Sequence, residues 1–370
     1  MIKKQLRLAL GSILKHFGYA LTKTHKSEPS QRNTQGLFLA HESELNIYQH
    51  ASSCQHSQVV KEQFKQKLKN NDYPLESFAC SICEDDSYTT VATSEEGFGW
   101  GICRSCGLLQ CHRRLPTDKL NEFYISGEYQ IICMNNLRDD IHYQLEYEIS
   151  SLYFIDIFNK FKLPLKNARI LEIGCGSGGI LRALQDNGAT VFGFDLDPHR
   201  IEVCKKYIKD LYSADALDPK IQFPEKIDYI ILSNILEHLS NPKEFLRNIR
   251  EKLKSDVYSW KNASVLIDVP NLEGAAFYSK ESFSKFLHIA HLWYFNAITI
   301  ERLLNAAGFT VEKIISRNSN FTVIAKPAEN SIENKNNAYW NSISSINIAN
   351  YITDPNNFDS KIKSVLEKYF

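Results

Sequence analysis

Four cysteines form two closely spaced pairs in the first third of the chain. Two residues separate Cys80 from Cys83, two separate Cys103 from Cys106, and nineteen residues lie between the pairs. Thiolates at this spacing can hold one tetrahedral Zn²⁺ between two short loops. The sequence therefore predicts a structural zinc site with these four cysteines as its ligands.

Residues beside the pairs add detail to this expectation. Gly107 follows the second pair and suits the left-handed turn that points backbone amides at sulfur, whereas Glu84 stands at the equivalent position after the first pair. Cys111 and His112 are close enough in sequence to serve as substitute ligands. A redox-active cysteine pair is the alternative, but two matched pairs favour a structural metal over thiol exchange.

A second group of residues with chemical potential lies in and after the segment ARILEIGCGSGGILRALQDNG. An apolar strand is predicted to end at Ile173, and a glycine-rich turn leads into an amphipathic helix that begins near Gly178. Gly174 and Gly176 leave the backbone bare where a ligand can lie against it, and amides at the helix start can meet ligand oxygens. The next predicted strand, TVFGFD, ends at Asp195, whose carboxylate can accept both hydroxyls of a ribose. We therefore expect a cofactor that contains adenosine.

The glycine spacing alone leaves the identity of this cofactor open. Gly174, Gly176 and Gly179 also fit the G-x-G-x-x-G pattern of nicotinamide-dependent dehydrogenases. Glu172, at the end of the first strand, favours a different cofactor, because its negative charge suits the cationic amino acid part of S-adenosylmethionine and suits a pyrophosphate badly.

These motifs resemble those of the class I S-adenosylmethionine-dependent methyltransferases over nearly the whole of Ala168 to Lys326. LEIGCGSG, FDLDP, SADALD and IDYIILSNILEHL occur in the order in which that family carries its motifs. The resemblance implies that Glu172 and the backbone of Gly174 and Gly176 hold the methionyl end of the cofactor. It also implies cofactor-binding roles near the ribose, the adenine ring and the floor of the site for Asp195, Leu196, Asp215, Ala216 and Asn234.

Two further polar residues are predicted to begin helices and are left out of the site. Asp197 precedes Pro198, so it is suited to cap a helix whose first residue is proline. Asn241 precedes another proline and has Glu244 three residues later, which is the pattern of a capped helix start.

Methyl transfer to a hydroxyl requires a base that removes the hydroxyl proton, and histidine is suited to this role near neutral pH. His238 follows the fourth predicted strand, where ligands of doubly wound folds gather, and is the first candidate. His291 and Tyr294 lie in a segment that resembles an H-x-x-Y-F element of this methyltransferase group and are the second candidates. The alternative for either histidine is a hydrogen-bonded structural role. His288, three residues before His291, has no H-E-x-x-H pattern to support a metal site.

The regular alternation of strands and helices predicts an α/β fold. In this fold a doubly wound, mostly parallel seven-stranded sheet of the class I methyltransferase type carries a small N-terminal zinc-ribbon-like module. The chain is expected to begin with a basic amphipathic helix (1–26) and a poorly defined, partly helical segment (27–75). The zinc-knuckle module (76–126) and a helical connector (127–165) follow. The methyltransferase domain (166–326) and a tail with a short helix (327–370) complete the chain.

Composition places few limits on the partners of this chain. Its 370 residues carry a formal net charge of zero, so no global attraction to nucleic acid or anionic membranes is expected. No apolar run approaches the length of a membrane span and no secretory leader is visible, which predicts a cytoplasmic protein. Basic residues on one face of residues 1–26 suggest peripheral contact with the inner membrane, although a helix docked on the protein itself has the same pattern.

The order of cysteine pairs, CGLLQ, a tyrosine-rich connector and a methyltransferase core resembles a bacterial family associated with sugar and polysaccharide modification. Some of its members methylate carbon atoms of nucleotide-linked deoxysugars, and others are thought to act on hydroxyls of surface glycans. The chain lacks the G-x-Y-H-E-H element associated with the carbon-methylating members. We therefore expect O-methylation of a sugar or glycan acceptor.

Three alternatives to this function stay open, apart from sugar C-methylation. A zinc module can bind nucleic acid, although only Arg104, Arg113 and Arg114 suggest a basic patch beside it. A nicotinamide oxidoreductase and a non-catalytic cofactor-binding protein are the others.

Overall fold

The computed structural model describes residues 55–126, 128–132, 147, 153–272, 287, 289–316 and 320–329. These residues fall into two compact units. The glycine-loop unit comprises Met1–Phe64 and Tyr124–Asp218, and the cysteine unit comprises Lys65–Phe123 and Pro219–Phe370. The helices predicted over residues 1–26 and near Ser360 to Tyr369 lie outside the described residues, as does His288.

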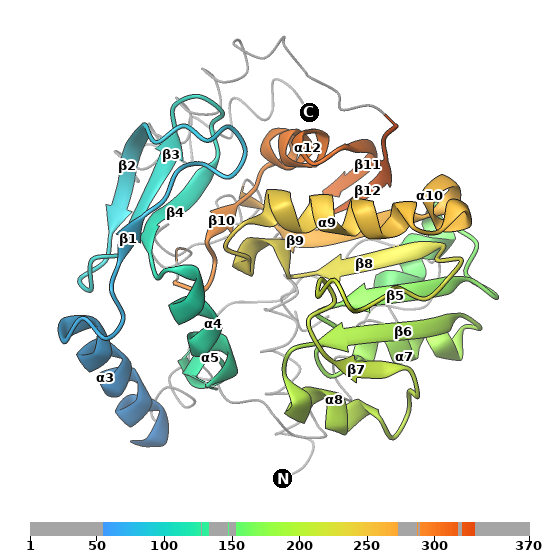
Figure 1. The fold of residues 1–370 in the computed structure, drawn as a ribbon, viewed down its shortest axis with the longest axis horizontal. Coiled ribbons are helices and arrows are strands. Elements are labelled where there is room, and N and C mark those ends of the chain that lie inside the picture. The colour runs from blue at the N-terminus through green and yellow to red at the C-terminus, as the bar shows by residue number, and fades with distance from the viewer. Residues whose placement is uncertain are drawn as a thin grey trace, which may run out of the picture. The chain divides into compact units, whose positions relative to one another are not determined.

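The larger sheet has seven strands in the order β11-β12-β9-β8-β5-β6-β7 (Figure 1). Strand β6 runs parallel to β5 and to β7, and β8 runs parallel to β9. Strand β12 is antiparallel to both β9 and β11. The predicted α/β methyltransferase fold with a mostly parallel seven-stranded sheet is therefore confirmed.

From β5 onward the described elements of the glycine-loop unit alternate between strand and helix. They are β5 (Arg169–Ile173), α7 (Gly179–Asp186), β6 (Thr190–Asp195), α8 (Pro198–Cys204) and β7 (Leu211–Ser213); α5 (Glu128–Ile132) and a helical stretch at residues 153–160 precede them. The core side of α7 buries Ile180, Leu181 and Leu184. At Gly193 in β6 an added Cβ would lie 2.6 Å from Leu211 Cδ2 and 2.7 Å from Leu181 Cδ1, so only glycine lets α7 and β7 pack this closely.

The cysteine unit contains a smaller antiparallel sheet in the order β1-β4-β3-β2, with β10 paired to β4. The elements from residue 55 to residue 125 are α3 (Gln55–Lys69), β1 (Glu76–Ser77), β2 (Tyr88–Thr93), β3 (Gly99–Cys103), β4 (Leu109–Arg114) and α4 (Thr117–Ile125). Helices α3 and α4 run across the boundaries of the two units at Phe64 and Phe123.

The second part of the cysteine unit supplies the other four strands of the larger sheet. Its elements are β8 (Tyr229–Ser233), η1 (Leu236–His238), α9 (Pro242–Lys254), α10 (Val257–Asn262), β9 (Ser264–Pro270), β10 (Trp293–Tyr294), α12 (Ala297–Ala306), β11 (Phe309–Ser316) and β12 (Asn320–Pro327). All residues of β8 are buried, as expected for a central parallel strand. Helix α9 packs with α10 and α12, and Figure 1 shows it lying across β8 and β9.

Several local predictions are confirmed. The first two strands of the methyltransferase region end at Ile173 and Asp195 as expected. Asp197 caps α8 by accepting a hydrogen bond from the His199 amide, and Asn241 caps α9 by accepting one from the Glu244 amide.

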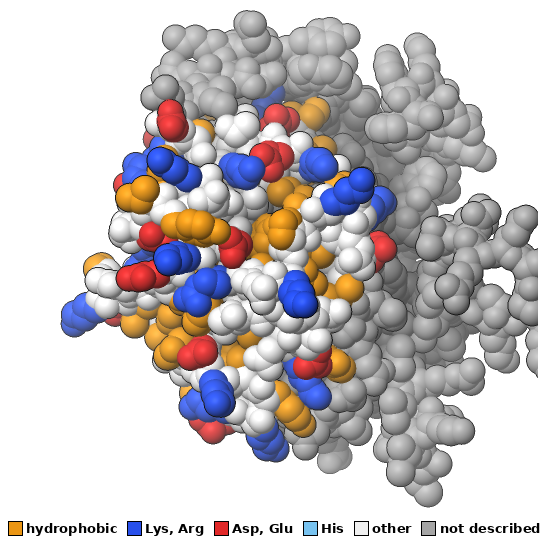
Figure 2. Space-filling model, turned by 90° about the vertical axis from the view of Figure 1, so that its right-hand side faces the viewer, with side chains coloured by type: hydrophobic (Ala, Val, Ile, Leu, Met, Phe, Trp, Pro, Cys, Tyr) orange, Lys and Arg blue, Asp and Glu red, His pale blue; other side chains and the backbone are white. Residues whose placement is uncertain are grey.

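The described helices include none with the length and apolar character needed to cross a bilayer. On the face drawn in Figure 2, basic and acidic side chains alternate, and neither sign forms a continuous patch there. This distribution agrees with the zero net charge of the sequence.

Candidate functional site

The turn after β5 contains three glycines with left-handed backbone. Gly174, Gly176 and Gly178 have φ angles of +75°, +53° and +75°. Side chains with a Cβ rarely adopt this region, so the turn depends on glycine at these positions. The amides of Gly174 and Cys175 donate to the Phe194 carbonyl at 2.7 and 3.0 Å, which ties the turn to β6. The backbone is thus bare and fixed where the sequence predicts the cofactor.

Asp195 is joined directly to this turn. One carboxylate oxygen accepts the Gly176 amide at 2.7 Å and the other accepts the Asp197 amide at 2.8 Å. Burial raises the pKa of Asp195, while these two amide hydrogen bonds act in the opposite direction. Each oxygen has a second lone pair, so the carboxylate can still accept ribose hydroxyls.

The other predicted cofactor residues of the glycine-loop unit lie around these two features. Glu172 is 1% exposed and is the next-to-last residue of strand β5, close to the glycine turn in sequence. Leu196, directly after Asp195, is 56% exposed, and its apolar side chain suits contact with a purine ring. The Ala214 amide donates to the Asp195 carbonyl at 3.1 Å, so the loop that carries Asp215 and Ala216 starts beside Asp195.

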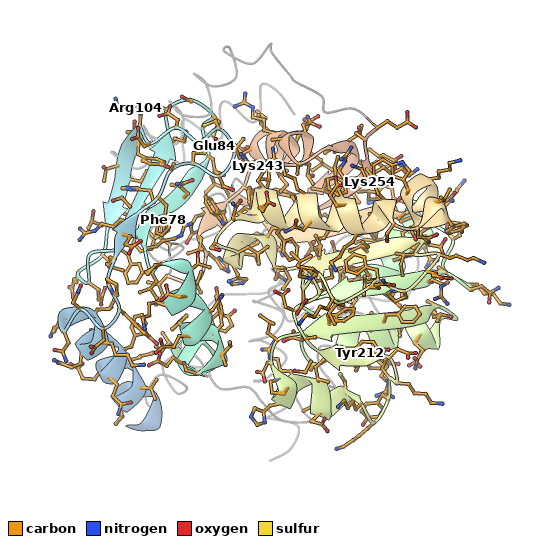
Figure 3. All side chains as sticks on the ribbon, viewed as in Figure 1. Phe78, Glu84, Arg104, Tyr212, Lys243 and Lys254 are labelled. Carbon is orange, nitrogen blue, oxygen red and sulfur yellow. The ribbon has the colours of Figure 1, made fainter. Side chains whose placement is uncertain are left out.

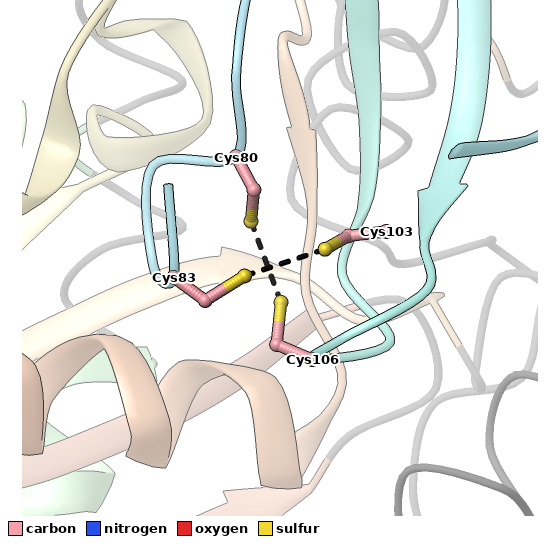
Figure 4. Close-up of side chains that lie close together, drawn as sticks. All are labelled: Cys80, Cys83, Cys103 and Cys106. Atoms are coloured by element: carbon pink, nitrogen blue, oxygen red, sulfur yellow. Dashed lines mark hydrogen bonds between the residues drawn. The ribbon is translucent and has the colours of Figure 1, made fainter. Parts of the chain in front are cut away.

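The four predicted zinc ligands lie together (Figure 4). The sulfur atoms of Cys80 and Cys106 are 3.4 Å apart, those of Cys83 and Cys103 are also 3.4 Å apart, and all four lie within 4.8 Å of one another. Four sulfurs bound tetrahedrally at ~2.3 Å from one Zn²⁺ would be separated by similar distances. The contact between Cys103 and Cys106 lowers the pKa of Cys103 and raises that of Cys106, so these thiols compete for a proton that a bound metal would displace. This donor set fits zinc.

The loops that carry Cys80–Cys83 and Cys103–Cys106 have the same backbone conformation at their ends. The Glu84 amide donates to the Cys80 carbonyl at 2.8 Å, and the Gly107 amide donates to the Cys103 carbonyl at 2.9 Å. Both donors are left-handed, with φ of +64° at Glu84 and +77° at Gly107. Glu84 therefore occupies a position where glycine would be unstrained, and its carboxylate pairs with Lys243 of α9 at 2.6 Å (Figure 3).

The substitute ligands considered from the sequence are placed elsewhere. The Cys111 sulfur lies 3.4 Å from the Arg113 carbonyl, and the His112 ring stacks on Tyr88 with the ring centroids 4.6 Å apart. Neither belongs to the group of four sulfurs.

The two candidate histidines lie close together in the cysteine unit. The rings of His238 and His291 meet edge to face with their centroids 4.8 Å apart. Nδ1 of His238 is 2.8 Å from the Ala290 carbonyl, which can only accept, so this nitrogen carries the proton. The other nitrogen, Nε2, is then left with a lone pair and can act as a base.

A carboxylate that the sequence reasoning missed completes this group. Glu237 is fully buried, and Oε1 lies 3.9 Å from His238 Nε2. Within the described part of the chain no other residue hydrogen-bonds to its oxygens. Burial raises the pKa of Glu237 to about 8; a hydrogen bond from its own amide acts in the opposite direction, and the nearby charge of Asp268 adds to the rise. The sequence does show an acidic residue next to the candidate base His238, which could have made Glu237 a candidate site residue. Its burial could not be predicted from the sequence.

The remaining predicted site residues of this unit have clear structural surroundings. Asn234 follows β8 with a left-handed φ of +52°, and its side-chain oxygen accepts from Asn320 at 3.3 Å. Asn320 also donates to the buried Asp268 at 3.1 Å. Asn234 therefore belongs to a polar network that joins the end of β8 to β9 and β12. Tyr294 is 1% exposed within β10, with its ring centroid 6.1 Å from that of His291.

The small sheet supports the histidine segment through its backbone. The Cys111 amide in β4 donates to the Leu292 carbonyl at 2.8 Å, and the Leu292 amide donates to the Glu237 carbonyl at 2.7 Å. Strand β10 continues this contact by pairing Trp293 with Gln110. The sheet that carries the cysteine loops and the segment that carries His291 are thus one hydrogen-bonded structure.

Comparisons with known proteins agree on the class of this domain. Residues 138–314 match the family described as "Methyltransferase domain". The chain is 32% identical over 100 residues to a mitochondrial ubiquinone biosynthesis O-methyltransferase of Schizosaccharomyces pombe, covering 23% of this chain and 34% of that protein. It is 32% identical over 112 residues to a ubiquinone biosynthesis O-methyltransferase of Pelagibacter ubique, covering 27% of this chain and 46% of that protein.

Among solved structures, a magnesium protoporphyrin IX methyltransferase from Synechocystis with bound S-adenosylhomocysteine is similar to this chain. The identity is 15%, the TM-score is 0.35, and the match covers 50% of this chain and 84% of that one. The chain spans less than half the length of the two curated relatives named above.

Proposed function

We propose that this protein is an S-adenosylmethionine-dependent O-methyltransferase. The main support is the arrangement of Asp195, whose carboxylate is held by the Gly176 amide above a left-handed glycine turn. The match of residues 138–314 to a methyltransferase domain and the names of the relatives point in the same direction. A nicotinamide cofactor is disfavoured by the buried acid Glu172, which would face its pyrophosphate.

We propose separate roles for the cofactor-binding residues and for the base. Glu172 and the bare turn would hold the cationic amino acid end of the cofactor, and Asp195 would hold its ribose. S-adenosylmethionine supplies the methyl group together with its own leaving group. His238 would remove the proton of the acceptor hydroxyl, because its Nδ1 hydrogen bond to Ala290 leaves Nε2 as the basic nitrogen. The glycine turn follows the carboxyl end of the parallel strand β5, and ligands of open α/β sheets bind at such strand ends.

The acceptor we propose is a hydroxyl of a sugar or surface-glycan intermediate, as the order of cysteine module and methyltransferase core suggests. A phenolic quinone precursor is the second candidate, because the relatives are named for ubiquinone biosynthesis. The cysteine module is proposed to hold one structural zinc through Cys80, Cys83, Cys103 and Cys106. Peripheral contact of residues 1–26 with the inner membrane from the cytoplasm also stays a proposal.

Calorimetric titration with S-adenosylmethionine and, separately, with NADH tests the cofactor. Binding of S-adenosylmethionine without binding of NADH is expected, and the reverse result would contradict the proposed function. A screen with labelled S-adenosylmethionine against nucleotide sugars, lipid-linked glycans and phenolic quinone precursors then tests the acceptor. Transfer of label to a phenol alone would favour the second candidate.

A further inference from the structure

Glu237 is the acidic residue of the histidine group, and the proposed mechanism has not used it. Its carboxyl group is fully buried, and in the part of the chain that the structure describes no other residue hydrogen-bonds to either oxygen. An ionised carboxylate in such a place is costly unless a cation or donor accompanies it. Nε2 of His238 lies 3.9 Å from Oε1 of Glu237.

The groups around Glu237 limit what can neutralise it. His238 shares its short helix, His291 faces His238 from the segment before β10, and Asp268 comes from β9. Asp268 accepts hydrogen bonds from Thr322 at 2.8 Å and from Asn320 at 3.1 Å. Of these neighbours, only the two histidines can carry positive charge.

We propose that Glu237 is a positioning residue that forms one proton-accepting pair with His238, in which the hydroxyl proton that His238 takes from the acceptor is shared with the Glu237 carboxylate. This inference rests on the proposed O-methyltransferase function. The acceptor's O–H bond breaks as its proton passes to Nε2, and its oxygen forms the bond to the methyl carbon. The bond from that carbon to sulfur breaks, and its electron pair stays on sulfur.

The charge balance explains why a buried acid helps this step. Before the reaction the active pair consists of a carboxylate and a neutral imidazole, with a net charge of minus one. After proton transfer the pair is neutral overall, so the buried negative charge is compensated. Burial of the carboxylate therefore makes the pair a stronger base than histidine alone. Burial raises the pKa of Glu237 to about 8, which gives its carboxylate the proton affinity that this sharing requires.

The first test needs no acceptor. Infrared difference spectra across a pH titration of the full chain should show the carbonyl stretch of a neutral carboxylic acid that disappears with an apparent pKa near 8. The signal should be lost in Glu237→Gln and kept in Glu251→Gln, a matched variant whose carboxylate is exposed on α9. A Glu237 that is already ionised at pH 6 would overturn the proposal.

Histidine NMR titrations test the coupling itself. The His238 resonance, assigned by its absence in His238→Gln, should titrate in Glu237→Gln with a pKa that is lower than in the unaltered chain. An unchanged His238 pKa in Glu237→Gln would overturn the pair. Loss of the carboxylic acid signal on adding Mg²⁺ or Zn²⁺ to the unaltered chain, but not to Glu237→Gln, would also overturn it, because the group would then be a cation site.

Kinetics with an accepted substrate gives the third readout. The pH profile of kcat/KM should rise through an apparent pKa near 8 in the unaltered chain, and in Glu237→Gln the rise should move to lower pH with a plateau about 10- to 100-fold lower. An unchanged profile would overturn the pair. Absence of any methyl transfer would contradict the proposed function, and the infrared and NMR results would still decide whether the pair exists.

Discussion

The guanidinium of Arg114 in β4 donates a hydrogen bond of 2.9 Å to the backbone carbonyl of Ser240, which lies just after the helix that carries Glu237 and His238. Arg114 is 2% exposed and also donates to the Cys111 carbonyl at 3.1 Å. Its guanidinium carbon lies 4.2 Å from the ring centroid of Phe78 and 4.9 Å from that of Trp293. One buried cation thus connects the small sheet with the segment that holds the candidate base.

Arg114→Met should destabilise the cysteine unit by about 2–4 kcal/mol, because one buried and one partly buried carbonyl group lose their charged donor and two aromatic rings lose a cation. Arg113→Met is the matched control, since Arg113 is the exposed neighbour of Arg114 in the same strand. Urea unfolding measures both variants. Equal stability of the two variants would show that the buried guanidinium contributes nothing to the connection.

Cys103→Ser should abolish zinc binding, whereas Cys111→Ser should retain it. Cys103 is one of the four clustered sulfurs, and the equally buried Cys111 lies outside them. Metal analysis of the unaltered chain should find about one zinc per chain. Chelation should lower the melting temperature, because folding of the two loops and metal binding are coupled. A well-folded chain without metal, or loss of zinc in Cys111→Ser as well, would contradict the assignment.

Much of the cofactor region was predictable because its signals are local. An apolar run followed by glycines set the end of β5 at Ile173, and the next run set the end of β6 at Asp195. Capping at Asp197 and the left-handed turn at Gly107 are also properties of a few adjacent residues. The two cysteine pairs could be grouped from their spacing, because one tetrahedral metal requires four ligands.

The features that escaped sequence reasoning depend on residues far apart in the chain. Trp293 of β10 pairs with Gln110 of β4. No local sequence pattern predicts that these two short strands, far apart in the chain, pair with each other. The burial of Glu237 follows from this packing, since Leu292 hydrogen-bonds to its backbone carbonyl. Periodicity predicts which face of an element is apolar, but it cannot predict which distant segment covers an acid.

Asp195→Ala should weaken binding of S-adenosylmethionine by about 1–3 kcal/mol, or roughly 5- to 150-fold. The variant loses the acceptor for the ribose hydroxyls and also the hydrogen bond that holds the Gly176 amide. Asp197→Ala removes a carboxylate two residues away whose role in the structure is to cap α8, so it should cost stability and leave affinity nearly unchanged. Calorimetric titration compares the two. Similar affinities in both variants would remove Asp195 from the cofactor site.

The stability of the chain should depend on pH through Glu237. Its carboxyl group ionises near pH 4.5 in the unfolded chain, whereas in the folded chain its pKa is raised to about 8. Between these pH values the folded state therefore holds one more proton than the unfolded state, so this group makes the folded state less stable as the pH rises. The loss is at most ~1.4 kcal/mol for each pH unit in this window.

Glu237→Gln removes this titration and keeps the shape of the side chain. The free energy of unfolding of this variant minus that of the unaltered chain should therefore increase from pH 5 to pH 8 and then level off, because both states of the unaltered chain are ionised above the folded pKa. Urea unfolding at several pH values measures this difference between the two free energies of unfolding. The contributions of other titrating groups cancel in it unless those groups interact with Glu237. Asp268 and His238 are the neighbours that could do so, and coupling to His238 would make the increase less steep. A difference that stays constant over this range would mean that Glu237 is ionised in the folded chain throughout, and that a neighbouring cation, not a shared proton, balances its charge.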